Sequence, residues 1–99
     1  MDKKIFVKAL NDVADAIESG HLRCGIGSMS KYGTGGAPNC AAGWVAAYAG
    51  VRPLEASELF NHFGVIVSAV TTPNDKGEAS KVVSQLKNIA TNVTKNTKL

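Results

Sequence analysis

The segment from Asn39 to Gly50 constrains the fold more than any other part of the chain. It reads Asn-Cys-Ala-Ala-Gly-Trp-Val-Ala-Ala-Tyr-Ala-Gly, and asparagine and glycine are residues that begin and end helices. The sequence therefore predicts a helix over residues 40–49. Small side chains fill most of its other positions, so a second element can approach it closely, as at the centre of a core. The face expected to be buried consists of Ala41, Trp44, Val45 and Tyr48.

Three further segments carry apolar residues at three- and four-residue spacing, which is the pattern of an amphipathic helix. They span residues 2–18, 53–63 and 77–93. Residues 65–70 read as a short helix or a buried extended connector, because no second strand is present to pair with them. Residues 71–77 contain Pro, Asn, Asp and Gly and read as a turn. The chain is thus predicted to be all-α, a compact bundle of four to five helices.

The apolar positions of these helices form the predicted core. In the three segments they are Ile5, Phe6, Ala9, Leu10, Val13, Ala14 and Ile17; Leu54, Ala56, Leu59, Phe60 and Phe63; and Ala79, Val82, Val83, Leu86, Ala90 and Val93, with Ile89 on the flank.

Length and composition favour one globular domain. The chain has 99 residues, of which 44% are hydrophobic and 19% charged, as in folded rather than disordered proteins. We expect a domain over residues 1–94 and a frayed polar tail over 95–99. No secretory pattern or long apolar run is visible, so we expect no membrane segment and a cytoplasmic location with both cysteines reduced.

The formal net charge of +3 is too mild to require an acidic partner. Only Arg23 and Arg52 are available for bidentate contacts, and there is no run of basic residues. The sequence therefore does not favour nucleic-acid binding.

A glycine-rich loop is predicted between the first and second helices, over residues 20–38. Loops of this length within a compact domain are often functional. The loop contains Arg23, Met29, Lys31 and Tyr32, and Arg, Met and Tyr are enriched at protein interfaces. These four are the predicted partner-binding residues.

Other kinds of site are open alternatives. His21, Cys24, Cys40 and His62 are residue types that bind zinc, although their spacing matches no paired zinc signature. The glycine runs before Cys40 fit phosphate binding only in part, since no Gly-Lys-Ser/Thr follows. Cys40, at a helix start, is a candidate reactive thiol. Because no nucleophile motif or acid–base pair stands out, we predict a protein that is not an enzyme and needs no cofactor.

The run Cys40-Ala41-Ala42-Gly43-Trp44 resembles a recurring element of small phage and bacterial proteins. In that element a helix leads through a loop with His and Met to Cys-x-Ala-Gly-Trp or -His and then to a second small helix. The residues that carry the resemblance are His21, Met29, Cys40–Trp44, Ala56, Leu59, Phe60, Phe63 and Gly64. The usual Cys-Gly-Thr run before the motif is absent, and Gly33–Asn39 stands in its place.

This resemblance carries no transferable function, but it implies a context. The expectation is a phage-type accessory protein that acts in the bacterial cytoplasm, where it binds a bacterial host protein and sterically inhibits or modulates it. The alternative is a small domain that binds a metal or a nucleotide-type phosphate ligand. The alanine-rich helix faces also allow a homo-oligomer.

Overall fold

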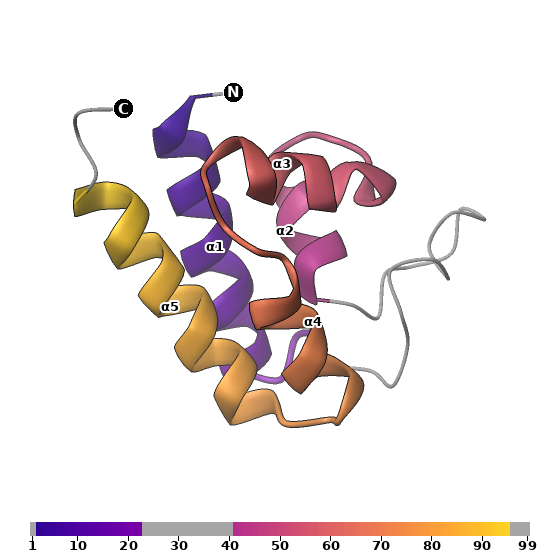
Figure 1. Ribbon diagram of the computed structural model, residues 1–99. Helices are drawn as coiled ribbons and strands as arrows, with labels where there is room; N and C mark the ends of the chain where they lie inside the picture. Colours follow the sequence, from indigo (N-terminus) through magenta and orange to yellow (C-terminus); the bar gives the residue numbers. More distant parts are fainter. Residues whose placement is uncertain (1, 23–40, 96–99) are drawn as a thin grey trace.

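The computed structural model describes residues 2–22 and 41–95 (Figure 1). They form five α-helices and one short 3-10 helix: α1 Lys3–Glu18, α2 Ala41–Tyr48, η2 Pro53–Glu55, α3 Ala56–His62, α4 Ser68–Asp75 and α5 Ala79–Lys95. No β-strand occurs in these two ranges, so the prediction of an all-α bundle is confirmed. Within the same ranges no helix has the length and hydrophobicity needed to cross a bilayer. The predicted glycine-rich loop lies almost entirely outside them.

The two longest helices, α1 and α5, pack against each other in opposite directions and form one side of the bundle (Figure 1). Helix α1 begins at Asp2, whose carboxylate accepts the backbone N–H of Lys4 at 3.0 Å. The side chains that α1 and α5 bury recur at helical spacing, as the sequence predicts. They are Phe6, Ala9, Leu10, Val13, Ala14 and Ile17 on α1, and Val82, Val83, Leu86, Ile89, Ala90 and Val93 on α5.

Helix α2 lies at the centre of the other layer and contacts α1, η2, α3 and α4. Its buried residues are the small ones, Ala41, Ala42, Gly43, Val45 and Ala46. The prediction that Trp44 and Tyr48 belong to the buried face is therefore wrong in part. Trp44 is half-buried and Tyr48 is 46% exposed, because the neighbouring helices approach the side of α2 that carries no bulky side chain.

The prediction of a turn over residues 71–77 is wrong for residues 71–75, which belong to helix α4. The helix continues through Pro73, which has no backbone N–H to donate to the preceding turn. Val70 and Asn74, one turn apart on the inner face of α4, are both fully buried, and their burial outweighs the loss of one hydrogen bond. The chain turns later, at Gly77, where a φ of +71° suits glycine.

The last helix is shifted by two residues from its predicted range of 77–93. It begins at Ala79, because Gly77 ends the connection from α4, and it continues through Lys95. Thr94 donates a hydrogen bond from its hydroxyl to the carbonyl of Ala90 at 2.7 Å. Lys95, the first residue of the predicted polar tail, is therefore the last residue of the helix.

Four predicted core positions also differ from the structure. Ile5 is 46% exposed and Leu54 is 59% exposed, whereas Ile89, expected on the flank, is buried. Ala79 is exposed at the start of α5. Residues 65–67 form the connector between α3 and α4, and only the part from Ser68 onward is helical.

Candidate functional site

Most of the residues predicted to bind a partner or a metal fall outside the part of the chain that the structure describes. This holds for Arg23, Met29, Lys31 and Tyr32, and for the candidate ligands Cys24 and Cys40. Among the described candidates are the two histidines, His21 and His62.

His21 follows the end of α1. Its Nδ1 lies 2.7 Å from the hydroxyl oxygen of Ser19, and its backbone N–H donates to the carbonyl of Ala16 at 2.9 Å. The side chain of His21 is exposed. The contacts of this histidine are therefore local and help to end the helix.

His62 lies at the opposite end of α1. Its ring meets Phe63 edge-on at 4.8 Å, and Phe63 stacks on Phe6 in the first turns of α1, with ring centroids 4.4 Å apart. From Phe6 to the end of α1 the helix rises by roughly 18 Å. Because the ligands of one zinc ion lie within about 2.3 Å of it, His21 and His62 do not contribute to one site. No cluster of three potential metal ligands occurs in residues 2–22 and 41–95.

The two described residues that flank the segment 23–40, Leu22 and Ala41, are both bonded to the helical body. On one side, the N–H of Leu22 donates to the carbonyl of Ala16 at 3.1 Å, and the Leu22 side chain packs on the core. On the other side, the N–H of Ala41 donates to Oδ1 of Asn74 at 3.2 Å. Asn74 and Ala41 are both buried, so α4 supplies an acceptor to the first residue of α2.

Trp44 lies one turn beyond this contact. Its indole Nε1 is enclosed and has no hydrogen-bond acceptor among residues 2–22 and 41–95, and its ring meets Tyr48 edge-on at 6.3 Å. An enclosed donor without an acceptor costs about 1–3 kcal/mol. The only tryptophan of the chain therefore packs its ring against the core and makes no indole hydrogen bond within the described part of the chain.

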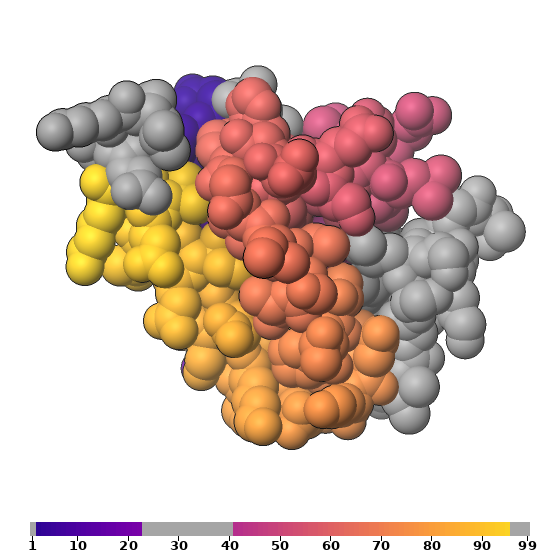
Figure 2. All heavy atoms as spheres, in the orientation of Figure 1, coloured from indigo at the N-terminus to yellow at the C-terminus, as the bar shows by residue number. Residues whose placement is uncertain are grey.

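A groove of about 580 Å³ separates the connector after α3 from the second half of α5. In Figure 2 these two segments run side by side on the face shown, the connector in salmon and the end of α5 in yellow. Most of the side chains along the groove are apolar. The lining residues are Phe63, Gly64, Val65, Ile66, Ala69, Ile89, Asn92, Val93 and Lys95.

Ile66 is the most exposed large apolar side chain in the described part of the chain, at 75%. Sequence reasoning missed this groove, because it treated the Val-Ile-Val run as buried. The sequence did contain one indication of the groove, because no second strand is present to pair with the Val-Ile-Val run. A short apolar connector that pairs with nothing leaves part of its surface open.

Charge is distributed unequally between the helical body and the rest of the chain. Of the 11 basic residues, Arg23, Lys31 and Lys98 lie outside residues 2–22 and 41–95, whereas all 8 acidic residues lie inside. The body is therefore formally neutral, with 8 residues of each sign. The formal excess of +3 comes from Arg23, Lys31 and Lys98.

Ion pairs within the body are exposed. Lys8 Nζ donates to the Asp12 carboxylate at 2.6 Å, and this hydrogen bond, together with the charge of the carboxylate, raises the pKa of Lys8. Lys87 Nζ lies 3.0 Å from a carboxylate oxygen of Glu18 and links α5 to α1. Exposed pairs of this kind contribute little to stability and mark no site.

Comparison of the chain with protein-family models, with curated proteins and with solved structures gave no match. The functional interpretation therefore rests on the residues and the geometry described above.

Proposed function

We propose that this chain works by binding another protein, as a phage-type accessory factor that inhibits or modulates a bacterial host protein. The observation that carries the proposal is the charge distribution. The segment 23–40 contains Arg23 and Lys31 and no acidic residue, whereas the helical body is neutral. A basic segment on a neutral body favours an acidic surface on the partner.

The attachment of the segment's flanks supports this interpretation. Leu22 is held at the end of α1, and Ala41 is held by Asn74 at the start of α2. Fixing both flanks of a binding segment on packed helices reduces the conformational entropy that binding has to overcome. Met29 and Tyr32 supply the apolar and aromatic contacts that dominate the energy of most interfaces.

The proposed mechanism is steric. A helical body of this size, bound through one segment, covers a surface on the partner without any chemical step. The bacterial host context follows from the resemblance of Cys40–Trp44 and its flanking residues to the element in small phage proteins. A cytoplasmic location and the absence of a cofactor are parts of the same proposal.

Affinity capture from a lysate of the bacterial host tests the proposal. The full chain is compared with Arg23→Ala and Tyr32→Ala, which we expect to lose most of a specific partner. Arg52→Ala and Tyr48→Ala are matched controls, because Arg52 and Tyr48 are exposed residues of the same types on the body. Circular dichroism establishes that all four variants keep the helical fold.

Two results would count against the proposal. One is the repeated absence of a specific partner for the wild-type chain. The other is a partner whose capture is unaffected by Arg23→Ala and Tyr32→Ala but is lost with Arg52→Ala or Tyr48→Ala, since the body would then bind it in place of the segment.

A further inference from the structure

The groove between the α3–α4 connector and α5 combines apolar side chains with polar surface, as a site for an amphipathic segment does. Its walls come from Phe63, Val65 and Ile66 on one side and Ile89 and Val93 on the other. Its volume of about 580 Å³ falls within the range of sites that hold small ligands or short peptide segments. Ile66 stands at its edge with three quarters of its surface in contact with solvent.

The base of the groove is rigid. Phe63 stacks on Phe6 of α1, and Phe6 in turn meets Phe60 edge-on at 5.3 Å. Phe6 and Phe60 are fully buried, and Ile89 and Val93 belong to the buried face of α5. The base and the α5 wall of the groove are thus part of the packed core, whereas Ile66 on the connector stands open to solvent.

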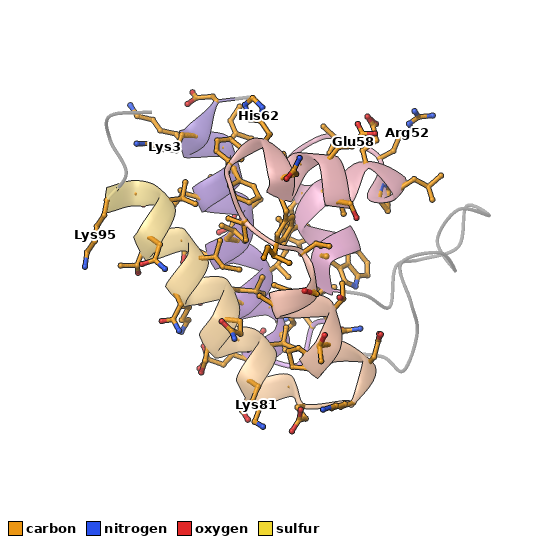
Figure 3. The ribbon with its side chains drawn as sticks, in the orientation of Figure 1. Lys3, Arg52, Glu58, His62, Lys81 and Lys95 are labelled. Atoms are coloured by element: carbon orange, nitrogen blue, oxygen red, sulfur yellow. The ribbon has the colours of Figure 1, made fainter. Side chains whose placement is uncertain are left out.

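The charge around the groove is positive. Among the described residues that line it, Lys95 is the only charged one. Lys3 and Lys4 lie in the first turn of α1, at the end of the bundle where α5 finishes (Figure 3 labels Lys3 and Lys95). In the described residues no ion pair joins these three lysines to a carboxylate. The carboxylate of Asp2, at the same end, caps α1.

We propose that this groove binds a short amphipathic helix of a partner protein, with apolar residues toward Ile66 and Val93 and carboxylates toward Lys95. The lining part of α5, from Ile89 to Lys95, rises by about 9 Å, which is nearly two helical turns. A segment of that length presents two or three apolar side chains at positions i, i+3 or i+4, and i+7. Carboxylates beside them complement the free lysines.

A second copy of the chain fits the groove less well. In a twofold dimer each surface meets itself. Copies joined through this groove would bring the unpaired lysines at the end of α1 and α5 toward those of the partner copy, without an acidic residue among the lining residues to offset them. Charge complementarity therefore favours an acidic partner.

The test uses the full chain and two synthetic helical peptides with the same leucine positions, one with glutamates on its polar face and one with lysines. Nuclear magnetic resonance titration follows the backbone amides. We expect saturable shifts at residues 63–69 and 89–95 with the acidic peptide, and none with the basic peptide. Binding of both peptides with equal affinity, saturable shifts confined to other residues, or the absence of a saturable shift would overturn the proposal.

Variants separate the apolar and the charged contributions. Ile66→Ser removes an exposed side chain without disturbing the core and should weaken the acidic peptide about tenfold or more. Lys95→Glu should weaken it several-fold at low salt and less at high salt. Leu54→Ser is the matched control, because Leu54 is 59% exposed and lies outside the groove. Equal affinity of Ile66→Ser and Leu54→Ser would refute the assignment.

The same experiment distinguishes this site from the segment 23–40 and from self-association. Arg23→Ala should leave the affinity for the acidic peptide unchanged, so the groove can succeed or fail independently of the function proposed above. Light scattering of the free chain should give the mass of a monomer. A dimer whose formation is abolished by Ile66→Ser would make a second copy the occupant and would refute the acidic partner.

Discussion

Asn74→Ala tests how strongly the start of α2 depends on α4. Asn74 is fully buried, and its Oδ1 accepts the N–H of Ala41, which is itself only 1% exposed. Removing the acceptor leaves a buried N–H without its partner, which costs about 1–3 kcal/mol. The packing lost with the amide adds to this cost, so we expect a total of about 2–3 kcal/mol.

This loss is large for a chain of this size. Domains of comparable length have unfolding free energies of about 5–15 kcal/mol, and 1 kcal/mol corresponds to roughly 4–8 °C in melting temperature. The melting temperature of Asn74→Ala should therefore fall by roughly 8–24 °C. Thermal and urea unfolding, followed by circular dichroism, measure the change.

Asn88→Ala is the matched control. It makes the same replacement in a helix, but Asn88 is exposed on α5. Both variants gain the higher helix propensity of alanine, so their difference in stability measures what the buried Asn74 side chain contributes, its contact with Ala41 included. Hydrogen exchange should also show faster exchange at Ala41 in Asn74→Ala alone. Equal stability of the two variants would refute the reasoning, because the Asn74–Ala41 contact would then contribute nothing.

Three further predictions concern the body. Leu10→Ala should cost about 2–5 kcal/mol in urea unfolding, whereas Ile5→Ala, at a half-exposed position of the same helix, should cost about 1 kcal/mol or less. Trp44→Phe should stay within about 1 kcal/mol of wild type, since the smaller ring is offset by removal of an N–H that has no acceptor among the described residues; a larger loss in thermal unfolding would contradict this. The pKa of Lys8 is higher in the folded chain than in the unfolded chain. The stability that the Lys8–Asp12 pair contributes is therefore fully present at pH values below the pKa of Lys8 in the unfolded chain, and it is lost as the pH rises through the pKa in the folded chain. Because the pair is exposed, Asp12→Asn should flatten the alkaline decline of the melting temperature only slightly, and a steeper decline in the variant would contradict the sign of the effect.

The long helices α1 and α5 could be predicted from the sequence because their signal is local. Each carries one apolar stripe, and only one side of such a helix can be buried. The same rule does not work for α2, which is apolar all round and offers no single stripe. Its buried side was decided by the closest approach of neighbouring helices, which selected Ala42 and Ala46 over Trp44 and Tyr48.

Helix α4 could not be predicted from local preferences. Pro73, Asn74, Asp75 and Gly77 are residues of turns, and the sequence favours a turn there. Within this helix Asn74 is buried, and its side chain accepts a hydrogen bond from Ala41, a residue 33 positions earlier in the chain. A contact of that separation leaves no trace in a local pattern.

The candidate sites also depend on contacts between residues that are far apart in the sequence. His21 and His62 are plausible zinc ligands by residue type, but their separation along α1 is a property of the packing of Phe63 on Phe6. The exposure of Ile66 also depends on where the connector crosses α5. The sequence therefore identifies side chains that are able to bind a metal or a partner, whereas only the fold shows which of these side chains lie close together.

Because the helical body carries no formal net charge, the same electrostatic argument applies to both proposed binding surfaces. A neutral body exerts little long-range attraction on an acidic partner, so any selection for acidic groups has to come from charges close to the contact. For the segment 23–40 those charges are Arg23 and Lys31, and for the groove the nearest is Lys95. The two surfaces should then differ in their response to salt. Binding through the segment, which carries two positive charges, should weaken more with increasing salt than binding in the groove, where Lys95 is the nearest charge and burial of Ile66 does not depend on salt.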